Sequence, residues 1–180
     1  FCRQATAKAS QSLARAEDAI IRAVRQAVLE EYYLNAGTKG SNAITADEFK
    51  KRLFELCSLS GLSGLPRKSR DRHILLKSVA LLLDKTQEYS EVEINQELQA
   101  WLTDVGRSIE LDHVELRRRL IDHEYLGRSK DGSRYWVAVW SRLQMAFERE
   151  IEEVDVPLLI KQSNQASLEK KRRYLSLQEN

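Results

Sequence analysis

Two neighbouring segments in the middle of the chain carry the basic side chains whose chemistry is easiest to assign. Three consecutive arginines stand in the first segment, and two arginines flank a lysine in the second. A guanidinium can clamp a phosphate or bond to O6 and N7 of guanine, so exposed arginines suit the recognition of nucleic acid. The candidate nucleic-acid contacts are Arg117, Arg118, Arg119, Arg128, Lys130 and Arg134.

The charge balance weighs against this assignment. The chain has 29 basic and 27 acidic residues, a net charge of +2, and residues 67–140 hold equal numbers of each. Because affinity for nucleic acid comes largely from neutralised phosphates, a neutral region also fits a protein partner. Arg117 has a structural alternative as well, since it could pair with Asp112 or Glu93 and hold the domain together.

The arginines are expected on the third helix of a small unit. Apolar spacing predicts a first helix from Arg70 to Asp84 and a short extended piece at 88–90. Ser90 and Glu93 form a capping box that opens the second helix. The third helix begins after Asp112, and its spacing turns three apolar residues inward and four polar residues outward. The inward set is Leu116, Leu120 and Ile121, and the outward set is Glu115, Arg118, Arg119 and Asp122.

After Leu126 the apolar pattern changes from helical to alternating. The pair Asp131–Gly132 suits a two-residue turn, so residues 126–137 are predicted to form a β-hairpin. Helix, short strand, two helices and hairpin is the order of a winged helix-turn-helix domain, whose third helix is the recognition element. The predicted fold class is therefore mainly α: three helices plus a β-hairpin wing, with flanking N- and C-terminal helices.

The flanking segments are also predicted to be helical. A long amphipathic helix is expected over residues 4–34, and a second helix begins at a capping box of Thr45 and Glu48. Ser141 and Gln144 predict a third capping box, and Pro157 suits the first turn of a last helix. The expected organisation is a helical region at 1–60, the winged helix at 65–140 and a helical extension at 141–180. A start at Phe1 rather than methionine favours a fragment of a longer protein.

Other classes of site find little support. His73, His113 and His123 lack the spacing of metal ligands on one helix, and the sequence contains no glycine-rich phosphate loop and no nucleophile beside a base. We therefore expect no metal, no cofactor and no enzyme activity. Tyr135, Trp136 and Trp140 are interpreted as core rather than as a stacking platform for bases. The longest apolar run is too short for a membrane helix, and Cys57 is expected to be a buried thiol.

Several motifs carry a resemblance to a known family. They are the run from Tyr89 to Asn95, Asp112 with the segment 116–122, and the segments 126–128 and 131–136. Over about Leu65 to Val137 the chain resembles a bacterial domain family of unknown function, numbered 2087. The resemblance implies a winged-helix-like domain that is often found in transcriptional regulators, and no established biochemical activity.

Two hypotheses follow. In the first, the chain is a non-enzymatic protein that binds double-stranded DNA through the third helix and the wing and regulates transcription. In the second, the winged helix and the flanking helices bind a partner subunit of a larger complex. Helices at 4–34 and 141–177 would supply the contact with a second copy or a partner protein, and the expected setting is the cytoplasm.

Overall fold

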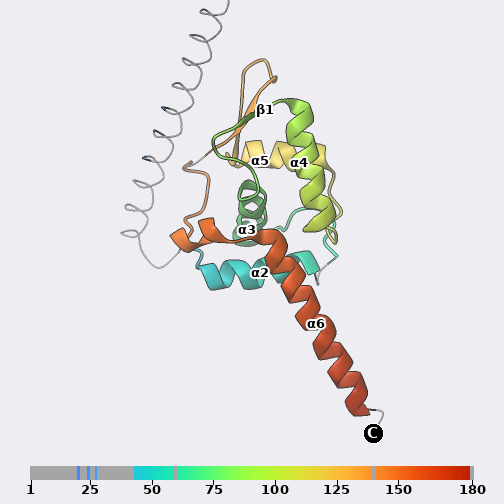
Figure 1. The fold of residues 1–180 in the computed structure, drawn as a ribbon. Helices are drawn as coiled ribbons and strands as arrows, with labels where there is room; N and C mark the ends of the chain where they lie inside the picture. Colours follow the sequence, from blue (N-terminus) through green and yellow to red (C-terminus); the bar gives the residue numbers. More distant parts are fainter. Residues whose placement is uncertain are drawn as a thin grey trace, which may run out of the picture.

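From residue 43 onward, the part of the chain that the computed structural model describes is mainly helical, with five α-helices and one small antiparallel sheet (Figure 1). The structure describes residues 20, 24, 27, 43–58, 61–138 and 141–178. Its elements are α2 (Ala46–Ser58), α3 (Ser69–Ala80), β1 (Glu88–Tyr89), α4 (Glu91–Asp104), α5 (His113–Asp122), β2 (Leu126–Arg128), β3 (Tyr135–Val137), the 3-10 helix η1 (Arg149–Glu153) and α6 (Val156–Gln178). The helix predicted over 4–34 lies outside the described residues apart from 20, 24 and 27, which are helical and exposed.

Helix α3 lies at the centre, between α2 with the start of α6 on one side and α4 with α5 on the other (Figure 1). Eight of its residues are buried, Ile74, Leu75, Leu76 and Val79 among them. Such all-round burial is typical of a core helix. The helix ends at Ala80 rather than at the predicted Asp84. The Asp84 N–H instead donates to the Tyr89 hydroxyl at 2.7 Å.

The sheet has the strand order β1-β3-β2, with antiparallel pairs throughout. Tyr89 pairs with Tyr135, and Leu126 pairs with Val137. Between β1 and α4, Ser90 accepts a hydrogen bond from the Glu93 N–H, and the Glu93 carboxylate accepts from the Ser90 N–H. The short strand, the capping box and the hairpin predicted from the sequence are therefore confirmed.

The connection between β2 and β3 differs from the prediction. Ser129 and Arg134 still face each other, since the Ser129 N–H donates to the Arg134 carbonyl at 3.0 Å, so four residues form the loop instead of two. Gly132 has φ of 75°, and the Asp131 carboxylate accepts from the Ser133 N–H and hydroxyl. The Asp131–Gly132 pair does lie in the turn, but Ser129 and Ser133 bond to the Asp131 carboxylate and lengthen the loop.

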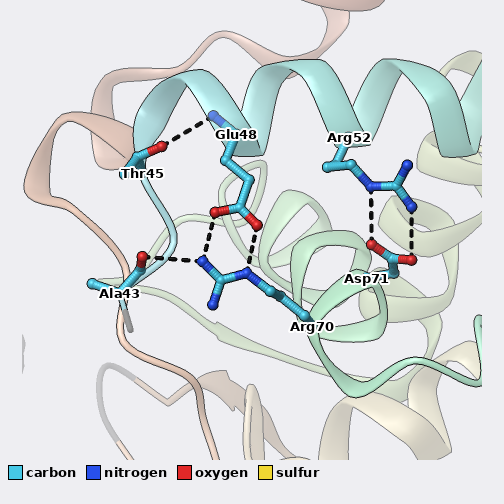
Figure 2. A network of polar contacts seen from close by, with 6 residues as sticks. All are labelled: Ala43, Thr45, Glu48, Arg52, Arg70 and Asp71. Carbon is cyan, nitrogen blue, oxygen red and sulfur yellow. Dashed lines mark hydrogen bonds and ion pairs between the residues drawn. The ribbon is translucent and has the colours of Figure 1, made fainter. Parts of the chain in front are cut away.

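A polar network fixes α2 onto α3 (Figure 2). At the start of α2, Thr45 accepts from the Glu48 N–H at 3.2 Å, as predicted. The Glu48 carboxylate also accepts two bonds from Arg70, whose guanidinium donates to the Ala43 carbonyl at 3.1 Å. One helical turn further, Arg52 and the buried Asp71 form a bidentate pair at 3.1 and 2.7 Å. Paired guanidinium–carboxylate bonds of this kind set the register of the two helices.

The prediction of a helix that begins at Ser141 is wrong, because residues 141–148 are not helical. The Ser141 hydroxyl donates to the Glu124 carboxylate, and the Gln144 amide donates to the carbonyls of Glu124 and Ala138. Both side chains thus bond to residues on either side of the hairpin instead of capping a helix. Residues 141–148 form turns, and Phe147 forms a parallel bridge with Ile44. Helix returns only at η1 and α6, and Pro157 does lie in the first turn of α6.

One hydrophobic core runs through all these elements. Besides residues of α3, α4, α5 and the sheet, the core includes Ile44, Phe49 and Leu53 before α3. It also includes Phe147, Ile151, Val156 and Ile160 after β3. Over the described residues, no helix is both long and apolar enough to cross a membrane.

Candidate nucleic-acid interface

Helix α5 presents a polar face to solvent beside the hairpin. Asp112 caps it by accepting from the Glu115 N–H at 2.7 Å. Leu116 and Leu120 are buried and Ile121 is half-buried. The predicted outward set of Glu115, Arg118, Arg119 and Asp122 is exposed. The helical spacing of this element is therefore confirmed.

Arg117 is a structural residue in this arrangement. Its side chain is only 14% exposed and forms an ion pair with Glu91 at 3.0 Å. It also donates to the Asn95 side chain and lies 5.4 Å from the centre of the Tyr135 ring. These contacts join α5 to α4 and β3. The guanidinium does hold the domain together, but its partners are residues of the first turns of α4 rather than Asp112 or Glu93.

Two further candidates form ion pairs at the surface. Arg119 pairs with Glu115 one turn earlier at 3.0 Å, and Arg134 pairs with Glu88 on the neighbouring strand at 3.3 Å. All four side chains are about half exposed or more. Exposed pairs of this type contribute little to stability, at most about 1 kcal/mol. Either arginine can therefore exchange its carboxylate for another anion at small cost.

The remaining candidates are Arg118, Arg128 and Lys130, all exposed. Arg128 lies over the Tyr135 ring, with 5.8 Å from the guanidinium carbon to the ring centre. Within the described part of the chain, no carboxylate forms an ion pair with any of the three. Of the six candidates, these three would meet a phosphate or a base edge without first leaving a carboxylate.

Of the aromatic side chains near the hairpin that the structure describes, one belongs to the core and one is half-buried. Tyr135 is buried, as predicted, and Trp101 on α4 is buried too. Trp136 is half-buried against Gly127, where any Cβ atom would lie 2.2 Å from the indole ring. Trp140 lies outside the described residues. The interpretation as a packing residue is confirmed for Tyr135.

Two histidines that the sequence separates widely meet at the end of α5. The rings of His73 and His123 are 5.3 Å apart, and His73 Nδ1 is 2.9 Å from the Tyr125 hydroxyl. Sequence spacing missed this contact because it is tertiary. Nowhere in the segments that the structure describes do three or more His, Cys, Asp or Glu residues gather as metal ligands would.

The buried histidine makes stability depend on pH. Burial, helped by His123 and Arg72, lowers the pKa of His73 from 6.5 to about 4. The unfolded chain therefore takes up a proton that the fold rejects as the pH falls from about 6.5 to about 4. We expect a loss of about 2–3 kcal/mol across this window. Urea unfolding at pH 7.5, 5.5 and 4.5 measures it, and an equally steep loss in His73→Gln would contradict the assignment.

The thiol of Cys57 is buried, as predicted, and burial raises its pKa to about 12. A thiol with so high a pKa is almost wholly protonated at neutral pH and is a poor nucleophile. Cys57 is therefore a packing residue at the end of α2.

Comparison with known proteins finds a family match for the middle of the chain. Residues 61–137 match the sequence model of a family described as "Uncharacterized protein conserved in bacteria (DUF2087)". The matched range begins eight residues before α3 and ends with β3. It therefore contains α3, α4, α5 and all three strands of the sheet. The family resemblance seen in the sequence is thereby confirmed. No curated protein and no solved structure matches the chain significantly.

Proposed function

We propose that the DUF2087 segment is a winged helix that binds double-stranded DNA through α5 and the β2–β3 hairpin. In this proposal α3, α4 and α5 are the three helices, and the hairpin is the wing. The element order and the strand order β1-β3-β2 support it, because such a sheet places the hairpin beside the third helix. Helix α5 enters the major groove and the hairpin contacts the adjacent backbone.

The observation that carries the proposal is the contrast between Arg117 and Arg118. Arg117 fixes α5 to α4 and β3, so the helix has a defined orientation. The next residue, Arg118, is exposed on the outward face and has no ion pair among the described carboxylates. A rigid helix that presents an unpaired guanidinium suits two-bond recognition of a guanine.

Neighbouring groups complete the surface. Val114 lies one turn before Arg118 on the same face and is 43% exposed, as an apolar contact to a thymine methyl requires. Lys130 and Arg134 on the hairpin supply phosphate contacts, with Arg134 leaving Glu88 when it binds. The proposal includes regulation of transcription as the role and the cytoplasm as the setting.

A titration of fluorescent duplex followed by anisotropy tests the proposal. Arg118→Ala is expected to weaken binding about 5- to 150-fold, because a good contact to a base is worth about 1–3 kcal/mol. Lys130→Ala is expected to weaken binding less and to reduce the salt dependence by about one phosphate contact. Arg149→Ala is the matched control, since Arg149 is exposed on η1 and η1 packs on α2.

Two results would reject the proposal. One is no binding at micromolar protein in low salt. The other is binding that Arg118→Ala leaves at the wild-type level while Arg149→Ala behaves the same way. Either result would show that α5 does not bind DNA.

A protein partner is the second candidate function, and exposed apolar side chains favour it. Val92 on α4 is 66% exposed, and Val114 on α5 is exposed as well. Ion pairs already engage three of the six candidate basic residues. A second copy or a partner subunit would then cover α4, α5 and the flanking segments 4–34 and 141–177. Purification from native cells discriminates the two functions, because a chain that co-purifies with a stoichiometric subunit and binds no duplex fits only this one.

A further inference from the structure

The second half of α6 extends away from the rest of the protein (Figure 1). From residue 164 to residue 176, every position whose exposure the structure describes is exposed. Residues 161–178 are helical throughout, which corresponds to a length of about 27 Å. At the start of this projecting end of α6, Lys161, Asn164, Gln165 and Leu168 line a pocket with Cys57, Ser58 and residues between 104 and 108. Beyond Leu168, every side chain that the structure describes is exposed to solvent, where a ligand can reach it.

The projecting end holds the positive charge of the chain. Residues 161–178 contain five basic side chains and one acidic one, Glu169. The rest of the chain has two more acidic than basic residues, since the totals are 27 and 29. The small net charge of the whole therefore hides a strongly basic segment, whose field attracts an anionic partner.

The basic residues surround the helix instead of forming one stripe. Lys170, Lys171, Arg172 and Arg173 are consecutive and exposed. At about 100° per residue they span roughly 300° of the circumference. A flat acidic protein surface could meet only part of such a ring. A helix in the major groove, by contrast, has a phosphate backbone on each side of it, so positive charge on several sides is matched.

We propose that the projecting end of α6 binds duplex nucleic acid as a phosphate-contacting helix. This contact is additional to the one proposed for α5 and does not depend on it. The C-terminal end of α6 and the β2–β3 hairpin lie at opposite ends of the part of the chain that the structure describes (Figure 1). One chain that uses both surfaces therefore holds two separate duplex segments.

The test neutralises the ring in the full chain, as Lys170→Gln/Lys171→Gln/Arg172→Gln/Arg173→Gln. Binding of a 30-base-pair duplex of mixed sequence is followed by anisotropy from 50 to 200 mM salt. We expect affinity to fall at least ~10-fold at the lowest salt. The magnitude of the slope of log affinity against log salt should fall by about three to four, which is about 0.9 for each of four lost phosphate contacts. Circular dichroism should show the same helix content as the wild type.

The matched control removes the same charge elsewhere, as Lys50→Gln/Lys51→Gln/Arg67→Gln/Arg149→Gln, four exposed residues away from α6's end. An equal loss of affinity in this control would overturn the inference, because only total charge would then matter. Wild-type affinity in the α6 variant would overturn it too, even if Arg118→Ala still weakened binding. Loss in the α6 variant with no effect of Arg118→Ala would support this inference and reject the one on α5.

Capture of a second duplex tests the bridging consequence. The protein is bound to an immobilised duplex, and a labelled duplex is then added. The wild type should retain the labelled duplex, and the α6 variant should not. Retention of the label at the wild-type level by the α6 variant would contradict two separate binding surfaces.

Discussion

Replacement of Phe147 by alanine should lower the free energy of unfolding by about 3–5 kcal/mol, the usual cost of removing a buried phenylalanine. Phe147 is 3% exposed and lies edge-on to Phe49, with ring centres 6.2 Å apart. Its backbone pairs with Ile44, and the Lys77 ammonium lies 5.6 Å from its ring centre. One side chain from outside the DUF2087 range therefore holds α2, α3 and the segment before η1 together.

Chemical unfolding measures this loss, with Leu143→Ala as the control. Leu143 lies in the same segment but is 54% exposed, so its replacement should change stability by no more than about 0.5 kcal/mol. A loss below about 1 kcal/mol in Phe147→Ala would mean that residues 141–148 are dispensable for the fold. The expected large loss would show that the stable unit reaches beyond 61–137 in both directions.

Replacement of Glu152 by glutamine should destabilise the protein by about 3 kcal/mol, because it leaves two lysines without their carboxylate in a poorly solvated site. Glu152 on η1 forms ion pairs with Lys77 of α3 and with Lys85. The side chains of Lys77 and Glu152 are 12% and 15% exposed. Burial also lowers the pKa of Lys77 despite the nearby carboxylate, so the ammonium depends on Glu152 to stay charged.

The same site predicts a pH dependence. Burial opposes ionisation of Glu152, but Lys77 and Lys85 outweigh it and bring its pKa from 4.5 down to about 2. Its contribution is therefore fully present above pH 4.5 and is lost as the pH falls through about 2. The Glu152→Gln variant should lack this acidic loss, whereas the loss between pH 6.5 and 4 caused by His73 should remain.

A second variant separates lost charge balance from poor folding. Lys77→Met/Glu152→Leu/Lys85→Met removes all three charges and should recover most of the stability lost in Glu152→Gln, since apolar side chains of similar size often replace buried ion pairs without loss. A triple variant no more stable than Glu152→Gln would show that packing rather than the unpaired ammonium groups causes the loss.

Much of the fold followed from local sequence signals. Ser90 with Glu93, Asp112, and the alternation after Leu126 marked element boundaries that the structure places within a few residues. Each of these signals is satisfied by backbone groups close in sequence, so no tertiary information is needed to interpret it. Exposure of Arg118 and Arg119 and burial of Leu116 and Leu120 followed from helical periodicity in the same way.

The turn after Ser129 departs from its prediction through serines only two residues from Asp131, but the other predictions that failed depended on partners more distant in sequence. Ser141 and Gln144 have the spacing of a capping box, but Glu124 and Ala138 engage their side chains. Arg117 pairs with Glu91 rather than with the residues closest in the predicted pattern. The meeting of His73 with His123 likewise requires α3 to pack beside the end of α5. Tertiary contacts determine the partners of these side chains, and the periodicity of the sequence does not predict such contacts.

Amide chemical shifts measured during a duplex titration test the central claim most directly. The sample is the variant with residues 170–173 neutralised, so that α6 contributes little, and the duplex has 16 base pairs. We predict that the largest shifts fall in α5 and in the hairpin loop, with Arg118 and Lys130 among them, while α2 and η1 stay unchanged. Shifts confined to α2, η1 or the start of α6, or no shift anywhere at saturating duplex, would contradict DNA binding by α5 and the hairpin.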